Sequence, residues 1–360
     1  MKIEAKKISF CITCMNRLHH LQETLKKNIE DNYLPDDVEF VLLDYNSKDG
    51  LEQWVQQNMQ FYIDIGILSY YKTTEPQYYL RSHSRNMVFR LASGNILCNL
   101  DADNFLGKGF AVEMIKEFEQ KRNIFYTSDL SSSDAYGRVC VLKNDFLSIR
   151  GYDEKLVGYG HEDRNLFLRL EKHQLKHLYY YNQEFNNAIK HSKLERINNE
   201  MIYDKLIATY VSYIDPFASK ILFLHNDLSF KELILRDEGV PDLIKNPLNI
   251  QNLGRNKFFL TEKPYESVWT KRTDSLISLQ YDGKEVVVDL LVSQFNIAND
   301  AFYKVVEEEF IVFIICFSDM AVNEWISLQM ISSNEVVNPD GFGKGIVYKN
   351  WNYDEPINLK

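Results

Sequence analysis

The sequence lacks several features that would place it at once in a functional class. It has no apolar run of the ~20 residues that cross a bilayer, because its most apolar late stretch, residues 310–317, is far shorter. It has no excess of basic residues, since 41 Lys and Arg face 51 Asp and Glu and give a net charge of -10. Residues 1–7 are charged, so no signal peptide is predicted. We therefore expect a soluble protein without a transmembrane segment that does not bind nucleic acid, whose phosphates need a basic surface.

Cysteine is also scarce. Five cysteines, an odd number in 360 residues, do not form the dense framework of a small secreted fold. Cys11 and Cys14 form a C-x-x-C pair, but they lie in an apolar run that is typical of a buried strand, and no second pair completes a zinc site. We expect buried thiols in a reducing compartment.

Enough apolar sequence is present for a large core, with 45% hydrophobic and 13% aromatic residues. A chain of 360 residues exceeds the usual single domain, which predicts a second unit. The alternation of strand and helix patterns fades near residue 205. We therefore predict an α/β domain over residues 1–215 and a smaller α+β domain of unknown role over residues 216–360.

Short apolar runs alternate with segments of helical spacing in the first half. The pattern predicts βαβ units in a mostly parallel sheet with helices on both faces, whose ligands bind at the carboxyl ends of the strands. In the second half, two β-rich runs flank Asp282-Gly283, a hairpin signal, and residues 305–317 form a strand or a helix. The predicted strands of the first half are 7–13, 38–43, 66–71, 95–100 and 137–142, and its helices are 18–29, 51–61, 84–92 and 164–173.

Two acidic motifs are the strongest candidates for chemistry. Asp101-Ala102-Asp103 follows a predicted buried strand, and on an extended chain residues two apart point to the same side, so both carboxylates could approach one Mg²⁺ or Mn²⁺ ion. Glu162-Asp163 follows a Gly158-Tyr159-Gly160 loop that could close over a substrate and supply a general base. The alternatives are a solvated turn for the first motif and an acidic helix start for the second.

Single polar residues near the same strand ends are weaker candidates. His191 is a possible metal ligand, although a solitary histidine is more often a surface or core residue. Arg17, Arg81 and Arg85 could pair with phosphate oxygens or simply be solvated. Asp44 could accept a hydrogen bond from a base or ribose, or cap its own turn through Ser47.

Taken together, and in their order along the chain, these motifs resemble those of glycosyltransferase family two, whose members have the GT-A fold. A second set resembles the catalytic region of β-1,4-galactosyltransferases and related chondroitin polymerase modules. The resemblance covers residues 7–200. It rests on residues 13–17, 44–50, 84–86, 93–94 and 101–103 for the family, and on residues 149–153, 158–163 and 189–192 for the narrower group.

The resemblance implies a role for each matching residue. Asp103 and His191 would bind the metal ion, with Asp101 beside them and facing the ribose. Asp163 would be the catalytic base and Glu162 would bind the acceptor. Tyr159 stands where galactosyltransferases have a tryptophan on a mobile loop, so it would contact substrate there. The predicted donor-binding set is Thr13, Arg17, Asp44, Arg85, Asp101 and Tyr159.

Two positions depart from the family pattern. Ala188 stands where galactosyltransferases offer a methionine sulfur to the metal, and alanine cannot ligate. Tyr45 replaces an acidic residue that is common in the family's second turn. These departures affect the expected metal preference and the expected recognition of the base.

The resulting hypothesis is an inverting transfer of a hexose or hexosamine, of galactose or N-acetylgalactosamine type, from a UDP-sugar to a saccharide hydroxyl with Mn²⁺ or Mg²⁺. By analogy, the setting would be bacterial surface polysaccharide synthesis in the cytoplasm, in some cases at the periphery of the inner membrane. A sugar nucleotidyltransferase is one alternative, although residues 13–17 lack the glycine-rich loop it would need. A non-catalytic carbohydrate-binding or scaffold protein on a decayed transferase fold is another. The oligomeric state stays open.

Overall fold

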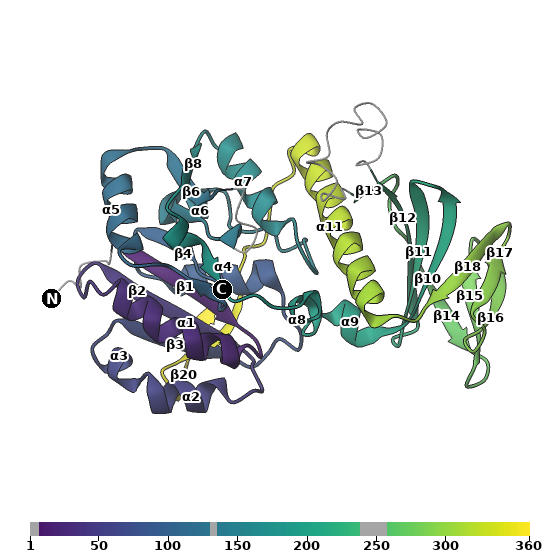
Figure 1. Cartoon of the computed structure of the whole chain (residues 1–360), viewed down its shortest axis with the longest axis horizontal. Helices are drawn as coiled ribbons and strands as arrows, with labels where there is room; N and C mark the ends of the chain where they lie inside the picture. The colour runs from purple at the N-terminus through teal and green to yellow at the C-terminus, as the bar shows by residue number, and fades with distance from the viewer. Residues whose placement is uncertain (1–6, 130–134, 238–257) are drawn as a thin grey trace. The chain divides into compact units, whose positions relative to one another are not determined.

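The computed structural model describes residues 7–129, 135–237 and 258–360, and the chain divides into two compact units (Figure 1). The first unit comprises Met1–Val157, His161–His191 and Asn334–Lys360, and the second comprises Gly158–Gly160 and Ser192–Ser333. This division differs from the predicted boundary between residues 215 and 216. Sequence periodicity indicates where a strand lies but not which distant sheet it joins, so the return of the last residues to the first unit was not foreseen.

The first unit contains a mixed sheet with parallel strands at its centre, as expected for an α/β fold. β1 pairs in parallel with β2 and β4, and β2 pairs in parallel with β3. β7 runs antiparallel to β4 and β6, and β19 runs antiparallel to β3 and β20. In spatial order the strands are β20 (Asn352–Leu359), β19 (Gly345–Lys349), β3 (Leu68–Thr73), β2 (Val38–Tyr45), β1 (Ile8–Cys14), β4 (Ile96–Asn99), β7 (Cys140–Leu142), β6 (Ile124–Ser128) and β8 (Lys176–Tyr180).

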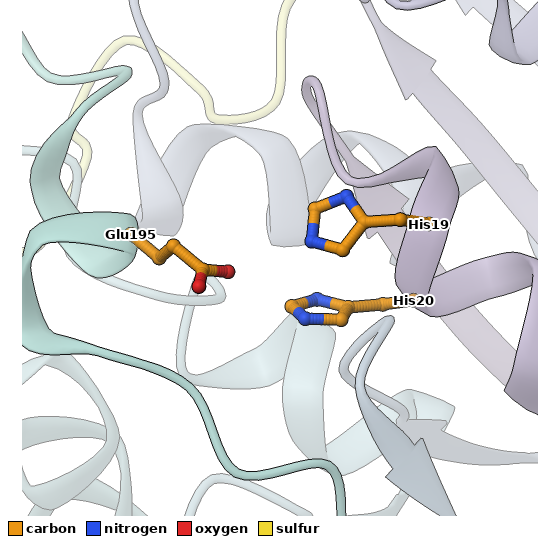
Figure 2. A group of neighbouring side chains, drawn as sticks. All are labelled: His19, His20 and Glu195. Atoms are coloured by element: carbon orange, nitrogen blue, oxygen red, sulfur yellow. The ribbon is translucent and has the colours of Figure 1, made fainter.

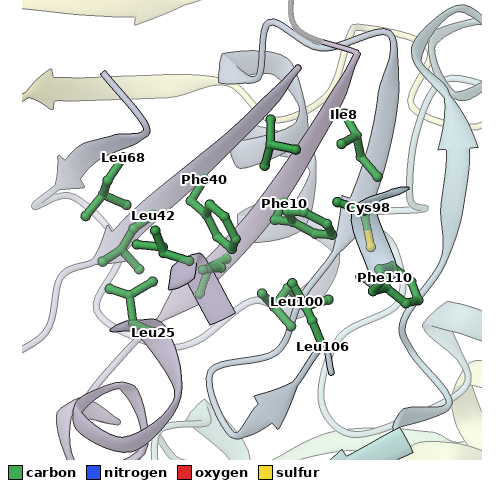
Figure 3. Close-up of a cluster of buried hydrophobic side chains, with 14 of the residues drawn as sticks. Ile8, Phe10, Leu25, Phe40, Leu42, Leu68, Cys98, Leu100, Leu106 and Phe110 are labelled. Carbon is green, nitrogen blue, oxygen red and sulfur yellow. The ribbon is translucent and has the colours of Figure 1, made fainter. Parts of the chain in front are cut away.

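Helices cover both faces of this sheet because the side chains of each strand alternate between them. Phe10 and Phe40 pack on one face, together with Leu25 and Phe110 from the helices (Figure 3). Cys11 packs in the cluster of the opposite face. The helices are α1 (Leu18–Asp31), α2 (Leu51–Asn58), α3 (Gln60–Asp64) and α5 (Phe110–Gln120) on the first face, and α4 (Arg81–Leu91), α6 (Lys143–Ser148) and α7 (Glu162–Lys172) on the second.

The cysteines fit the expectation of buried thiols. Cys14 belongs to the core cluster on one face of the sheet and Cys11 to the cluster on the other. Their sulfurs therefore point in opposite directions and do not share a metal ion. All five cysteines of the chain are buried, and none of them forms a disulfide bond.

The C-terminal segment, Asn334–Lys360, is hydrogen-bonded to the first unit at several points. The Arg150 guanidinium donates to the carbonyl oxygens of Val337, Asn338 and Pro339. The Asn338 amide donates to the carbonyl oxygens of Arg150 at 2.8 Å and Tyr152 at 2.7 Å, and its oxygen accepts from the Glu154 N–H at 3.1 Å. The predicted C-terminal domain over residues 216–360 is therefore shortened at this end, since these residues complete the first unit.

The second unit contains an antiparallel sheet whose strands run in the order β16 (Lys284–Asp289), β15 (Leu276–Tyr281), β14 (Tyr265–Lys271), β12 (Ser229–Asp237), β11 (Ala218–His225), β10 (Leu206–Asp215), β18 (Asp300–Val305) and β17 (Gln294–Ile297), with β13 (Phe258–Leu260) beside β12. The predicted hairpin around Asp282-Gly283 is confirmed as β15 and β16. Two short helices, α8 (Lys193–Ile197) and α9 (Met201–Lys205), precede the sheet.

The helix α11 (Glu308–Ser333) is much longer than the apolar stretch seen in the sequence. Among the described residues it is the one helix with the length and apolar composition to cross a membrane, with a mean hydropathy of 1.6 over its best window. Half of that window, 50%, is buried within the protein. Ile315 and Cys316 pack with Phe223 of the sheet, so this helix supplies core to the second unit.

Candidate active site

The Asp101-Ala102-Asp103 motif follows β4 as a turn rather than as extended chain. The Asn104 N–H donates to the Asp101 carbonyl oxygen at 3.0 Å, which closes the turn. The Thr24 hydroxyl of α1 donates to the Ala102 carbonyl oxygen at 2.7 Å and holds the turn against the helix. The two carboxylates therefore do not share one side of an extended chain as predicted, and they have separate partners, Arg85 for Asp101 and His191 for Asp103.

Asp103 lies beside His191, as the predicted metal pair requires. The two-residue strands β5 (Asn104–Phe105) and β9 (Asn187–Ala188) pair, and the Ile189 N–H donates to the Asp103 carbonyl oxygen at 2.8 Å. Asp103 Oδ2 and His191 Nε2 lie 2.7 Å apart and are hydrogen-bonded. Burial acts to raise the pKa of Asp103, but the hydrogen bond and charge of His191 outweigh it, so the pKa lies below its ordinary value.

A second histidine lies next to this pair. Figure 2 shows the rings of His19 and His20 close together at the start of α1, with centroids 4.1 Å apart. The His20 ring is also 5.3 Å from the ring of His191. Burial, reinforced by His19, lowers the pKa of His20 to about 4. His20 is therefore neutral at physiological pH and adds no positive charge beside Asp103.

Arg85 of α4 joins the first acidic motif to the second. Its Nη1 donates to Asp163 Oδ1 at 2.8 Å and to Glu162 Oε1 at 3.1 Å. Its Nη2 donates to Asp101 Oδ1 at 3.2 Å. The guanidinium is 5.4 Å from the centre of the Tyr152 ring, and the arginine side chain is only 6% exposed. We define these residues, Arg85, Asp101, Glu162, Asp163 and Tyr152, as the arginine cluster.

The acidity of Asp163 is strongly perturbed within the arginine cluster. Burial raises the pKa of Asp163 to about 7; Arg85 opposes the rise, while the charges of Glu162 and Asp101 add to it. Gly137 permits this packing, because a Cβ at that position would lie 2.7 Å from Asp163 Oδ2. A carboxyl that titrates near neutral pH is suited to exchange a proton with a substrate hydroxyl.

Two other predicted donor-binding residues have internal partners. The Thr13 hydroxyl lies 2.7 Å from the Tyr79 hydroxyl. Asp44 is fully buried, and its carboxylate accepts from the Ser47 N–H at 2.7 Å and from the Tyr70 hydroxyl at 2.7 Å. Burial raises the pKa of Asp44. These contacts favour the turn-capping role for Asp44 over recognition of a base or ribose.

Arg17 and Tyr159 are the remaining donor-binding candidates. Arg17 precedes α1 in a loop that is tied to the loop after β2, since the Asn16 N–H donates to Ser47 Oγ at 3.1 Å. Tyr159 belongs to the second unit, where its N–H donates to Asp319 Oδ2 at 3.1 Å and its hydroxyl accepts from Arg196 Nη1 at 2.7 Å. The structure thus brings together Asp101, Arg85, Glu162 and Asp163, and separately Asp103 and His191, within the first unit.

Residues 9–198, slightly more than half of the chain, match the family described as Glycosyl transferase family 2. The chain belongs to glycosyl transferase family 2. This confirms the family resemblance and the GT-A fold of the first unit, whereas the narrower resemblance to β-1,4-galactosyltransferases stays a prediction. No curated protein matches this chain.

Solved structures similar to this chain are distant. They include the mannosyltransferase PcManGT from Pyrobaculum calidifontis in complex with GDP-Man and Mn²⁺, at 16% identity, a TM-score of 0.42 and coverage of 50% of this chain and 56% of that one. S. aureus TarS 1-349 matches at 14% identity and a TM-score of 0.38, over 46% of this chain and 55% of its own. GalNAc-T7 with UDP, GalNAc and Mn²⁺ matches at 14% identity and a TM-score of 0.41, over 49% and 42%. The chain thus spans about half the length of each.

Three residues of the chain that contribute to the site were not singled out from the sequence. His20 lies near the start of an ordinary helical pattern, and Tyr152 was considered only as part of a motif. Arg138 donates to Asn104 Oδ1 at 2.7 Å and to the Phe105 carbonyl oxygen at 3.0 Å, and so supports β5. An arginine that is 1% exposed carries no sequence signal of its burial.

Proposed function

We propose that the first unit is an inverting, metal-dependent glycosyltransferase that moves a hexose or hexosamine from a UDP-sugar to a saccharide hydroxyl. The observation that carries the proposal is the arginine cluster. There a buried aspartate with a pKa of about 7 shares one guanidinium with the first aspartate of the Asp101-Ala102-Asp103 turn. A base and a donor-side carboxylate are thereby held at one edge of the sheet.

The residues beside the turn fit a divalent ion. Asp103 offers a carboxylate oxygen and His191 an imidazole nitrogen, already 2.7 Å apart, and both are ligand types that Mn²⁺ accepts. The side chains are 18% and 9% exposed, so the pair is shielded from bulk water without being sealed. When bound, the ion would neutralise negative charge on the departing diphosphate. Ala188 contributes no ligand, and its backbone pairs with Asn104 instead.

Asp163 is assigned as the base that removes the proton of the acceptor hydroxyl. Direct displacement requires a carboxylate that can be ionised at neutral pH and protonated during the reaction, and a pKa near 7 meets both conditions. Arg85 orients the Asp163 carboxylate and limits how far its pKa rises. Glu162, held by the same Arg85 nitrogen, is assigned to bind the acceptor.

The narrower assignments extend the family resemblance. The proposal includes a galactose or N-acetylgalactosamine donor and a bacterial surface polysaccharide as the product. It also includes a cytoplasmic location, or peripheral association with the membrane. A non-catalytic scaffold would have no reason to place a carboxyl with a neutral pKa beside the donor turn. A nucleotidyltransferase does not fit the family to which the chain belongs.

The test is a screen of UDP-sugars with Mn²⁺ in which both UDP release and transfer to saccharide acceptors are measured. Saturating ligand, at 100 times its dissociation constant, would also stabilise the protein by about 2.7 kcal/mol and raise its melting temperature. We expect one UDP-sugar to give both signals and the product to carry a β linkage by NMR. Stabilisation without any UDP release or transfer would support the scaffold alternative, and an α-linked product would exclude inversion of an α-linked donor.

A further inference from the structure

The second unit carries two exposed tyrosines on neighbouring strands. Tyr213 of β10 is 72% exposed and Tyr303 of β18 is 45% exposed. Tyr303 lies directly opposite Val211, at the end of the pairing of β10 with β18, and Tyr213 follows two residues beyond Val211 on β10. Residues two apart on one strand share a face, so the two tyrosines face the same side of the sheet.

Polar and small residues complete the surface around the two rings. Ser219 lies opposite Tyr213, Gln294 lies opposite Tyr303, and Asn296 lies opposite Ala301. Residues directly opposite each other, or two apart on one strand, share a face of the sheet. Gln294 and Asn296 are exposed, on the edge strand β17. We name this surface the tyrosine platform, and its members are Tyr213, Ser219, Gln294, Asn296, Ala301 and Tyr303.

The tyrosine platform does not serve the core of the unit. Val211 and Val305 share the face of the platform and are buried in a core cluster, whereas Tyr213 and Tyr303 are exposed and lie outside the core clusters of the described residues. Within residues 7–129, 135–237 and 258–360, the rings of Tyr213 and Tyr303 contact no other aromatic ring and their hydroxyls have no protein hydrogen-bond partner. Covering such a ring removes apolar surface from water, at about 25 cal/mol per Å². The two rings therefore offer binding energy that the fold leaves unused.

The chemistry of the tyrosine platform selects its ligand. None of its six residues carries a formal charge, although 26% of the chain is Asp, Glu, Lys or Arg. An uncharged surface offers no attraction to phosphate, carboxylate or metal ions. Flat aromatic faces pack against the C–H faces of a sugar ring, and the amide and hydroxyl groups of Gln294, Asn296 and Ser219 can donate to and accept from sugar hydroxyls.

We propose that the tyrosine platform binds a neutral saccharide, as a site separate from the catalytic residues of the first unit. The choice of saccharide over other neutral ligands draws on the family of the chain. It does not rest on the proposed donor, metal or base. Such a site would retain a saccharide chain on the protein whether or not transfer takes place.

The test is native affinity electrophoresis of the full-length protein in gels that contain soluble neutral polysaccharides, namely dextran, galactomannan, mixed-linkage β-glucan and β-1,4-galactan. EDTA is present and nucleotide sugar is absent, so the outcome is independent of the transfer reaction. We expect at least one polysaccharide to retard the wild-type protein. Tyr213→Ala and Tyr303→Ala should each weaken the affinity about two- to tenfold, the range for one aromatic contact.

Matched controls separate the tyrosine platform from exposed tyrosine in general. Tyr181 is 72% exposed and Tyr33 is 46% exposed, both in the first unit, so Tyr181→Ala and Tyr33→Ala reproduce the chemical change elsewhere. They should leave the retardation unchanged. Should either platform variant unfold, Gln294→Ala on the exposed edge strand provides a milder change that should still weaken binding.

Three results would overturn the proposal. The first is that none of the four polysaccharides retards the wild-type protein. The second is that folded platform variants bind as well as wild type, or that the control variants lose as much affinity. The third, from light scattering, is that Tyr213→Ala converts a dimer into a monomer, which would show that a second copy of the chain covers this surface instead.

Discussion

Asp163 should set the acidic limb of the pH–rate profile, and its neighbours should move that limb in opposite directions. The base must be deprotonated to accept a proton, so the rate should rise with pH through a midpoint near the raised pKa of about 7. Removing the Glu162 charge takes away one cause of the raised pKa, and the limb of Glu162→Gln should therefore shift to lower pH. Removing Arg85 takes away the opposing cause, and the limb of Arg85→Gln should shift to higher pH.

The size of the Glu162 effect follows from the geometry. Glu162 Oε1 and Asp163 Oδ1 bind the same Arg85 nitrogen at 3.1 and 2.8 Å, so they lie no more than 5.9 Å apart, the sum of the two distances. At an effective dielectric constant of about 20, two unit charges at that separation interact by roughly 3 kcal/mol, which corresponds to about 2 pH units. The guanidinium between them screens part of this repulsion. We expect a shift of about 1 to 2 pH units.

The assay is the pH dependence of kcat at saturating UDP-sugar and Mn²⁺ for wild type and both variants. Glu171→Gln is the matched control, since Glu171 is an exposed glutamate on the same helix. Arg85→Lys keeps the positive charge and should move the limb less than Arg85→Gln. The assignment of Asp163 fails if the Glu162→Gln limb does not move, or moves to higher pH.

Other predictions test the metal pair, the base and the C-terminal segment. Asp163→Asn should lower the transfer rate by about 10²–10⁴-fold while UDP binding persists; near-normal transfer would place the base elsewhere. UDP affinity by calorimetry should fall sharply in EDTA, and His191→Ala should show the same low affinity in Mn²⁺ without a lower melting temperature; equal affinities with and without metal would contradict the metal pair. Asn338→Ala should cost about 2–4 kcal/mol in urea unfolding, because it deletes three hydrogen bonds and removes the Asn338 partner of the Arg150 carbonyl oxygen and of the Glu154 N–H, while the Tyr152 carbonyl oxygen keeps the Asn86 amide. Asn358→Ala on exposed β20 should change stability by less than about 0.5 kcal/mol. A chain that ends at Ser333 should lose UDP binding, and a folded truncation that still binds UDP would show that the C-terminal segment is dispensable for the donor site.

Much of the first unit could be predicted from the sequence, because the patterns that mark its strands and helices are local. The apolar run of β1 and the helical spacing of α1 each depend on residues within one element. The rule that ligands bind at the carboxyl ends of parallel strands predicted the edge of the sheet where Asp101 and Asp103 lie, whereas the pairing of Asp103 with His191 was implied by the family resemblance. That rule needs only strand order and direction, which short crossovers largely determine.

Other features depend on partners that no local pattern specifies. The pairing of β5 with β9 involves two residues on each strand, too few for any periodicity. Arg85 carried a charge suited to phosphate, but its burial beside three carboxylates depends on how α4, α7 and the turn after β4 pack together. The turn itself is closed by one hydrogen bond from the Asn104 N–H, whereas the sequence pattern predicted an extended chain at this point.

The pairing of β19 with β3 has a consequence for how the chain is made. Tyr348 and Lys349 pair with Lys72 and Tyr71, so the ribosome must synthesise the entire second unit before this edge of the first sheet can close. Until then β3 offers unpaired backbone groups, which other strands can join. The second unit, by contrast, is continuous apart from Gly158–Gly160 and can fold as soon as it emerges. The nascent first unit therefore exposes this strand edge until residues 345–349 emerge, and a stop codon between residues 334 and 345 should produce aggregation rather than a shortened, folded protein.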